Sequence, residues 1–549
     1  MRVADVSGRG SLWEVLLRPG GSDSSLHVWE DGGYRRTSWA EVIVAATSKA
    51  AGLKKLGVGA GEPVACVLTN QFDVGTAMIG IWLAGGVVVS LPTPARGMPI
   101  MDYATQLREL MAIVDARLMV IEQQFAAMLP DDVFPGVRVI GADDIGGGSG
   151  SLSPPGDDDV ALIQFSSGTT AEPKGCMLSP GAMAAQLEML SRAADIDPQR
   201  DRGVMWLPMS HDMGLFGGIL LAFWNRIDAA LSTPQRFLAS PRTWLEDCVQ
   251  FGATLTVGPT FALSMALRGL ESRAPAGAIP IRRWIVGSDR LEWPIISSAA
   301  EGFAPYGVDM AAFCPAYGLA EATLAVTFSS DGGPQTLTVD SGRLLDGEVH
   351  EVEADAEGAS RLVSSGVPLA GVTVRIDSAS GGVGEIAVRS PSLSGGYVAQ
   401  PELTATRFAS GELRTGDVGF VHDGHLYVVG RLDDMVSIGG RNVDLAAVEA
   451  AVLGAPEVAV RGLALVDVIS GDKNLFVALV EVSDSTGPRR PTAHAIRRLA
   501  AASAGIRLSE CIFLDRGSLP KSPSGKVQRY RCRTLVSRAE LSPIERVSV

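Results

Sequence analysis

Hydrophobic and polar residues alternate along the first 330 positions in a pattern that predicts helices between short buried strands. The runs 39–56 and 101–114 repeat their apolar residues with the period of a helix. The runs 63–68 and 87–91 are short and mostly apolar, as in strands that are buried on both faces. Because the two kinds of run take turns, we predict a mostly parallel α/β sheet in this part of the chain.

A stretch rich in Gly and Asp, 146–159, interrupts this region, so we expect two α/β sheets. The alternation continues beyond it, and the expected strands at 254–257 and 283–286 each lead into a glycine. Active sites of such sheets gather where the strands end. Two longer apolar stretches, 77–91 and 214–231, resemble membrane spans. A glycine pair ends the helix of the first and polar residues interrupt the second, so both predict a buried helix and strand, with no membrane span.

After about residue 330 single polar and apolar residues alternate between glycine turns, which predicts an antiparallel, barrel-like part. The runs are 372–376, 385–389 and 425–429. A smaller unit is expected from about residue 434. Its predicted elements are helices at 445–453 and 493–504 and a strand near 475–479.

The predicted fold class is α/β, divided into two domains because 549 residues are too many for one hydrophobic core. The large N-terminal domain, 1–430, holds the two α/β sheets and the barrel-like part. Residues 431–433 connect it to a small α+β C-terminal domain, 434–549.

Composition and charge narrow the functional classes. The chain is 46% hydrophobic and 20% charged, which is typical of a globular protein. Its net charge of −14 argues against nucleic acid and anionic membrane surfaces as partners. The six cysteines are scattered without a C-x-x-C pair, which favours reduced structural thiols. The N-terminus lacks the apolar core of a signal peptide, so we expect a cytoplasmic location.

The most informative motif follows the apolar run 160–165, which predicts a strand that leads into a loop. Small hydroxyl and glycine residues let backbone N–H groups and hydroxyls converge on phosphate oxygens, and Lys174 adds a positive charge. A Walker A motif is excluded, since no Gly-Lys-Ser/Thr closes the loop. From the residues alone, a hydroxyl-rich surface loop is the alternative. The loop residues are Ser166, Ser167, Gly168, Thr169 and Thr170.

Two further motifs carry chemistry. Tyr317 can stack on a purine, Gly318 lets a backbone approach closely, and Glu321 can hold Mg²⁺ between phosphates. Taken alone, a Tyr-Gly pair before a helix is also a common turn. His211 precedes Asp212, which invites a general-base interpretation, but adjacent residues rarely serve each other in that way.

Five motifs in this order, spread over residues 30–530, resemble those of the adenylate-forming superfamily. That superfamily contains acyl-CoA synthetases, luciferases, peptide-synthetase adenylation domains and acyl-AMP ligases. The resemblance implies that ATP and Mg²⁺ are the cofactors. Ala171 stands in the phosphate loop where the family usually has glycine.

The resemblance also implies roles for individual residues. Ser288 and Asp289 fall in an adenine-facing segment, although Asp289 and Arg290 replace the usual Glu-Pro pair. Asp417 and Arg431 correspond to the residues that contact the ribose. The remaining assignments are His211 and Gly214 in the acyl pocket, Asp433 at a hinge about which the small domain moves, and Lys526 as the catalytic lysine that bridges the substrate carboxylate and the α-phosphate.

The residues of these motifs are most similar to the corresponding residues of fatty acyl-AMP ligases. The stretch 335–347 is similar to an insertion that those ligases carry and acyl-CoA synthetases lack. Against this, Asp433 stands where many of these ligases have lysine, and the segment 439–445 lacks the usual Tyr-Pro step.

We therefore expect an acyl-AMP ligase that activates an apolar carboxylic acid, of fatty, polyketide-like or polycyclic type, and releases pyrophosphate. An amino acid is not expected, because Met213 begins the stretch where amino-acid-activating relatives place an acidic group. A carrier protein or a separate acyltransferase is the expected acyl acceptor, in preference to CoA. The alternatives are an acyl-CoA synthetase that completes the thioester and an inactive protein that binds acyl-AMP or nucleotide.

Overall fold

The structure is a computed structural model. The residues that it describes are 10–18, 24–94, 98–130, 133–165, 173–272, 275–330, 332–378, 382–438, 441–470, 473–483, 489–521, 527–538 and 540–549. None of the described helices is long and apolar enough to cross a membrane. All six cysteines are buried and unpaired.

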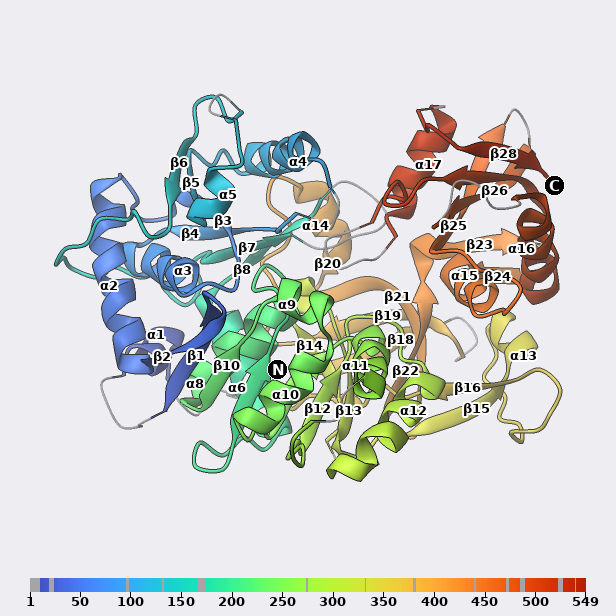
Figure 1. Ribbon diagram of the computed structural model, residues 1–549, viewed down its shortest axis with the longest axis horizontal. Coiled ribbons are helices and arrows are strands. Elements are labelled where there is room, and N and C mark those ends of the chain that lie inside the picture. Colours follow the sequence, from blue (N-terminus) through green and yellow to red (C-terminus); the bar gives the residue numbers. More distant parts are fainter. Residues whose placement is uncertain are drawn as a thin grey trace.

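The larger sheet has nine described strands and fills the lower part of Figure 1. Its central strands pair in parallel, whereas β2, β14 and β17 pair antiparallel at the two edges. In spatial order the strands are β17(Val367–Pro368), β14(Ala325–Phe328), β13(Phe313–Gly318), β12(Arg283–Val286), β11(Leu255–Gly258), β9(Arg202–Met205), β10(Asp228–Leu231), β1(Ser25–Glu30) and β2(Gly33–Ser38).

The second sheet has six described strands, and only β8 pairs antiparallel among them. In spatial order they are β6(Arg138–Gly141), β5(Leu118–Ile121), β3(Pro63–Val67), β4(Val87–Leu91), β7(Leu162–Phe165) and β8(Gly175–Leu178). Side chains alternate across it: Val64 and Cys66 join the core shared with the larger sheet, and Ala65 joins the core on the outer face. Both faces are thus buried, which explains the uninterrupted apolar runs.

The helices of the large domain cover these sheets. They are α1(Leu12–Leu16), α2(Trp39–Lys55), α3(Phe72–Ala84), α4(Ile100–Ile113), α5(Gln123–Ala126), α6(Pro180–Ala193), α7(Asp212–Gly214), η1(Leu215–Leu220), α8(Leu221–Asn225), α9(Pro234–Ala239), α10(Arg242–Gln250), α11(Thr260–Ser272), α12(Trp293–Phe303), η2(Ala304–Tyr306), η3(Met310–Ala312), η4(Ala320–Ala322) and α14(Pro401–Arg407). The first glycine of the predicted pair ends α3, since Gly85 has φ 101° in the left-handed region that glycine tolerates.

A curled antiparallel sheet forms the predicted barrel-like part. Its strands are β18(Thr373–Asp377), β19(Gly384–Arg389), β20(Phe408–Ala409), β21(Glu412–His422) and β22(His425–Arg431). One face packs on the end of β13, where Ile386, Val388 and Leu426 share a buried cluster with Tyr317. The predicted insertion, 335–347, contains β15(Thr336–Asp340) and α13(Ser341–Leu345), and β15 forms a hairpin with β16(Ala359–Val363), which lies beyond it.

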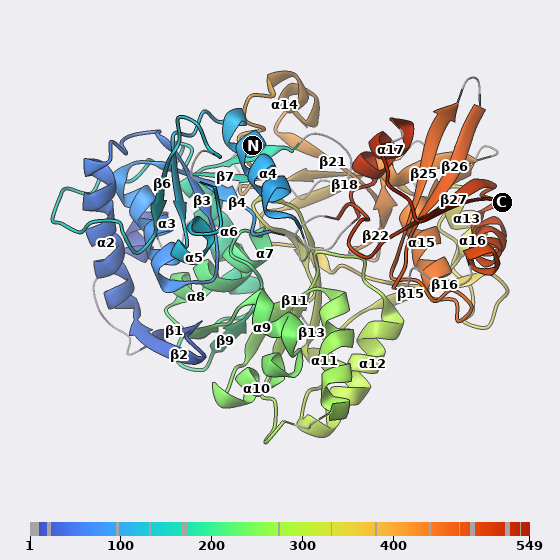
Figure 2. The ribbon, with the colours of Figure 1, turned by 45° about the horizontal axis from the view of Figure 1, so that its top comes forward.

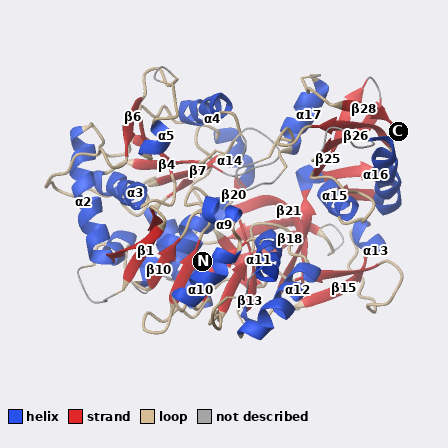
Figure 3. Ribbon diagram, in the orientation of Figure 1, coloured by secondary structure: helices blue, strands red, loops and turns tan. Residues whose placement is uncertain are grey.

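The small domain lies at the end of the molecule opposite α2 in both ribbon views (Figures 1 and 2). Its four-stranded sheet packs on α15 and α16 with one face and on α17 with the other, because Leu465 and Val466 belong to different cores. Figure 3 shows these helices beside the strands. After η5(Leu432–Asp434), which overlaps the predicted connection, the elements are β23(Met435–Ile438), β24(Arg441–Asp444), α15(Leu445–Leu453), β25(Gly462–Ser470), β26(Lys473–Glu481), α16(Arg489–Ala504), β27(Leu508–Leu514), α17(Arg529–Ser537) and β28(Glu545–Ser548).

The predicted fold class is confirmed, with shifts at element boundaries. The largest is in α16, which begins at Arg489 and not at residue 493. Pro491 favoured the later start, but a proline is tolerated in the first turn of a helix, where N–H groups have no partner within the helix.

Candidate active site

The predicted phosphate loop connects two paired strands of the second sheet. β7 ends at Phe165 and β8 begins at Gly175, and these two residues pair in antiparallel register. Lys174 precedes β8. Ser166, Ser167, Gly168, Thr169 and Thr170 lie outside the described residues, as does Lys526, so their roles stay predictions.

Lys174 and Glu321, from two different predicted motifs, meet at the ring of Tyr397. The Tyr397 hydroxyl donates to Glu321 Oε1 at 2.9 Å. The Lys174 ammonium lies 5.8 Å from the centre of the same ring. Burial and the nearby Glu321 carboxylate raise the pKa of Tyr397 well above its usual range, so the phenol remains a donor at neutral pH.

Tyr397 was missed by the sequence analysis. It lies in a segment that pairs with β8, where Val398 N donates to Gly175 O and Met177 N donates to Gly396 O. This pairing brings the tyrosine beside the phosphate loop, although 76 residues separate it from Glu321. Its neighbours, Gly395 and Gly396, indicate only a turn, so no local signal reveals the contact.

The predicted adenine and ribose residues form one hydrogen-bonded group. The Tyr317 hydroxyl donates to Asp417 Oδ2 at 2.7 Å, and Arg431 Nε donates to Asp417 Oδ1 at 2.8 Å. Asp417 and Arg431 face each other directly across β21 and β22. Burial and the Asp417 carboxylate raise the pKa of Tyr317, so this phenol also stays protonated.

Two predicted site glycines are required by the chain's own backbone. A Cβ on Gly318 would lie 1.8 Å from the Leu324 carbonyl oxygen, and one on Gly214 would lie 2.2 Å from the Pro208 carbonyl oxygen. The backbone that closely approaches Gly318 is therefore that of the chain's own turn after β13.

His211 contacts residues of two predicted motifs. Its Nδ1 lies 2.7 Å from Asp212 Oδ1, and its Nε2 lies 3.5 Å from Ser288 Oγ. The two adjacent side chains therefore lie in contact with each other. His211 is the extended residue before α7, and the Asp212 carboxylate beside it accepts from the N–H of Met213 at 2.7 Å, which holds the carboxylate at the start of the turn.

Asp289, in the predicted adenine-facing segment, has a structural contact. Its carboxylate accepts from the N–H of Thr260 at 2.9 Å and so caps the start of α11. Ser288 has φ 70°, a left-handed conformation that costs a non-glycine residue about 1–3 kcal/mol and is enriched at functional sites. Arg290 Nη1 lies 3.6 Å from Asp444 Oδ2 and so contacts the small domain.

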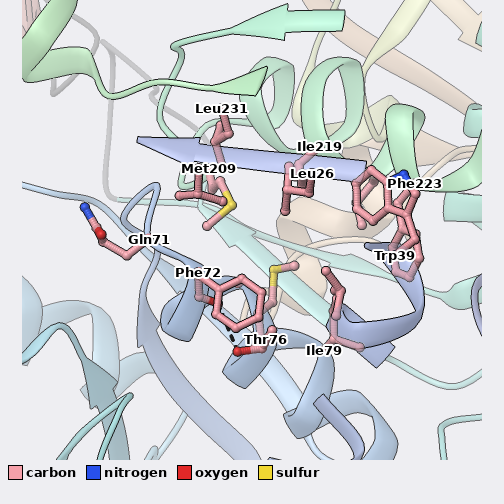
Figure 4. A pocket seen from close by; sticks show the side chains of 15 residues that line it. Leu26, Trp39, Gln71, Phe72, Thr76, Ile79, Met209, Ile219, Phe223 and Leu231 are labelled. Carbon is pink, nitrogen blue, oxygen red and sulfur yellow. Dashed lines mark hydrogen bonds between the residues drawn. The ribbon is translucent and has the colours of Figure 1, made fainter. Parts of the chain in front are cut away.

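An apolar cavity lies beside the segment that leads into His211 (Figure 4). α3 contributes Phe72 and Thr76 to one side, and β1 contributes Leu26 to another. No charged side chain lines it among the described residues. The full lining is Leu26, Val28, Trp39, Val42, Gln71, Phe72, Gly75, Thr76, Met78, Ile79, Met209, Ile219, Leu220, Phe223 and Leu231.

The described residues fit a magnesium ion that is bound together with a nucleotide. They contain no group of three or more His, Cys, Asp or Glu side chains placed to hold a metal ion. Mg²⁺ needs none, because it commonly takes one or two carboxylates and completes its shell with phosphate oxygens and water. Glu321 Oε1 is held by Tyr397, and in the described part of the chain Oε2 has no hydrogen-bond donor.

The chain is similar to several known proteins. A 4-hydroxyphenylalkanoate adenylyltransferase of Mycobacterium tuberculosis is 29% identical over 508 residues, covering 85% of this chain and 81% of that protein. A long-chain-fatty-acid–AMP ligase of the same organism is 28% identical, with 90% of each chain covered. A structure from work on fatty acyl-adenylate ligases of E. coli and L. pneumophila has a TM-score of 0.87 at 25% identity, covering 98% of this chain and 99% of that chain. Residues 21–398 match the sequence profile of AMP-binding enzymes, more than half of the chain, and this protein therefore belongs to the AMP-binding enzyme family.

Proposed function

We propose that this protein is an ATP-dependent ligase that converts an apolar carboxylic acid into an acyl-AMP and releases pyrophosphate. The observation that carries the proposal is the turn from β13 to η4. It places Tyr317, bonded to Asp417, four residues from Glu321. Glu321 accepts from the hydroxyl of Tyr397, whose ring is also near Lys174. Groups suited to a nucleoside and groups suited to its phosphates thus lie on the two sides of one turn.

Each group has a proposed role in nucleotide binding. Asp417 and Arg431 contact the ribose hydroxyls. Both Asp417 oxygens already accept one hydrogen bond, but a carboxylate oxygen has a second lone pair, so a ribose hydroxyl can still donate to it. The Tyr317 ring faces the adenine. The residues 166–170 and Lys174 bind the phosphates.

The proposed reaction is an in-line displacement at the α-phosphorus. A carboxylate oxygen of the acid forms the new P–O bond, and the bond to pyrophosphate breaks. Lys526 stabilises the negative charge that grows on the non-bridging oxygens, an effect of about 3–4 kcal/mol for a single donor in a water-excluded site. Glu321 would hold Mg²⁺, whose positive charge offsets the negative charge of the phosphates.

The acid is proposed to be apolar, of fatty, polyketide-like or polycyclic type. His211 and Gly214 border its pocket. The nearby cavity has no charged lining residue, which fits a hydrocarbon environment. The relatives named for long-chain-fatty-acid–AMP and 4-hydroxyphenylalkanoate adenylation support this class of substrate.

The acceptor is proposed to be a carrier protein or a separate acyltransferase. The insertion hairpin packs Leu337 and Val339 on Phe420 and Tyr427 of the curled sheet. Its helix α13 contacts β24 of the small domain. An element at this position can hold the small domain out of a pose that forms a thioester with CoA.

The hinge is proposed at residues 431–433, between domains 1–430 and 434–549. Arg431 is the last residue bonded to the large domain through Asp417, and Asp434 is bonded to Arg529 of the small domain. Asp433 lies between them, where a change in φ and ψ would swing one domain relative to the other. A cytoplasmic location, which supplies ATP and keeps thiols reduced, fits the unpaired cysteines.

One product assay tests the function. The protein is incubated with ATP, Mg²⁺ and a panel of long-chain, aromatic and polycyclic acids, with and without CoA, and products are read by mass spectrometry. We expect acyl-AMP and pyrophosphate in both conditions. Accumulating acyl-CoA would replace the proposal by an acyl-CoA synthetase, and the absence of any acyl product across the panel would favour an inactive binding protein.

A further inference from the structure

We propose that Tyr397 is a positioning residue that holds the Glu321 carboxylate in the orientation needed to bind a divalent cation with ATP. The inference rests on the proposed function, since it assumes that Glu321 is the metal ligand. It adds a residue that lies outside the five motifs and that acts only through Glu321.

The contact leaves Glu321 one oxygen for the cation. Tyr397 donates to Oε1 at 2.9 Å, which fixes the plane of the carboxylate. Glu321 lies in the short helix η4, which covers only Ala320–Ala322, so no long helix restrains its side chain. Without the phenol, this half-buried side chain would be free to rotate among several rotamers, and binding a cation would then have to order it.

Tyr397 itself is held rigidly. Its side chain is only 4% exposed, and its ring packs edge-on against Phe408 at 5.5 Å. Its backbone N–H donates to Thr404 Oγ1, and the residue bridges Cys176 of β8. The phenol therefore has a fixed position from which to orient its partner.

The ring also lies between opposite charges. The Lys174 ammonium is within cation–π range of the ring, whereas Glu321 contacts the hydroxyl. These two described residues form no ion pair with each other. An ammonium bonded directly to Glu321 would compete with the cation, so the intervening ring leaves Lys174 available for phosphate and Glu321 available for metal.

The test uses Tyr397→Phe, which removes the hydroxyl and keeps the ring. A hydrogen bond to a charged group is strong enough that we expect the Mg²⁺ concentration for half-maximal adenylation to rise about tenfold or more. A binding readout accompanies the kinetics. Mn²⁺ binding to the full-length protein saturated with α,β-methylene ATP, which cannot react, is followed by electron paramagnetic resonance, and its Kd should rise by a similar factor.

Tyr103→Phe is the matched control. Tyr103 is fully buried in α4 and donates to Pro92 O at 2.9 Å, so the variant loses a buried tyrosine hydrogen bond, to a neutral carbonyl, away from the site. It should leave the Mn²⁺ Kd unchanged. Equal weakening by both variants would overturn the inference, because it would show general loosening of the domain.

A double variant decides whether Tyr397 acts through Glu321. Glu321→Gln alone should weaken Mn²⁺ binding strongly, and adding Tyr397→Phe should change the Kd by less than about twofold, since coupled residues are not additive. If Glu321→Gln weakens binding but Tyr397→Phe does not, the inference fails and the proposed function stands. If Glu321→Gln has no effect, the metal assignment in the proposed function fails, and the inference fails with it.

Discussion

Replacing Arg529 with methionine is expected to destabilise the small domain by about 3–5 kcal/mol. Arg529 Nε donates to Leu465 O at 3.1 Å, and its two terminal nitrogens bond to Asp434 and Glu449. The guanidinium is 4% exposed and the two carboxylates 10% and 8%. Methionine fills much of the space, but it leaves both acidic groups buried without a cation.

The magnitude follows from the burial of the partners. Removing one member of a buried ion pair costs about 3–5 kcal/mol, because the remaining charge is left desolvated. Glu449 retains a hydrogen bond from Leu465 N at 2.6 Å, which offsets part of the cost. The destabilisation should also affect the proposed active site, because Arg529 is three residues after Lys526 in the sequence and Asp434 directly follows the proposed hinge.

The assay must resolve the small domain from the rest of the chain. All nine tryptophans precede residue 434, so tryptophan fluorescence reports only on the large domain. Hydrogen exchange measured by mass spectrometry on peptides from 441–538 reports on the small domain. Arg529→Met should accelerate exchange there, whereas the fluorescence transition in urea should move little.

Arg498→Met is the control within the same domain. Arg498 pairs with Glu457 at 2.8 Å, but the two side chains are 67% and 42% exposed. Exposed pairs contribute about 1 kcal/mol or less. The reasoning is refuted if Arg529→Met destabilises the small domain no more than Arg498→Met does.

Three further results are expected. Lys526→Ala should lower acyl-AMP formation about a hundredfold or more with nearly intact ATP binding, because its contact strengthens in the transition state; an unchanged turnover number in steady-state adenylation would contradict the assignment. Asp433→Pro should allow near-normal single-turnover acyl-AMP formation but slow release or transfer, since proline fixes φ at the hinge; unchanged burst and steady-state phases would exclude this hinge. Burial raises the pKa of Glu449 to about 7, so the folded protein holds a proton that unfolding releases. The stability of the small domain should therefore be highest at acid pH and decrease as the pH rises through about 7, and Glu449→Gln should remove this slope in hydrogen exchange measured across pH, a result that an unchanged slope would contradict.

Local signals in the sequence determined the elements and the order of the motifs. The strand at 87–91 and the helix at 445–453 have the predicted bounds, because apolar periodicity and flanking glycine or polar residues act within a few positions. The resemblance that identified the family likewise depends on short motifs, each readable without knowing where the others lie.

Only the tertiary structure decided which of these residues meet. Tyr317 bonds to a carboxylate 100 residues away, and Arg529 bonds to Asp434 across 95 residues. Asp289, in the predicted adenine-facing segment, caps α11, which lies 29 residues earlier in the chain. Tyr397 reaches Glu321 because its segment pairs with β8. Such contacts depend on strand order and on the packing of one layer against another, and nothing in the periodicity of a single segment encodes its distant partner.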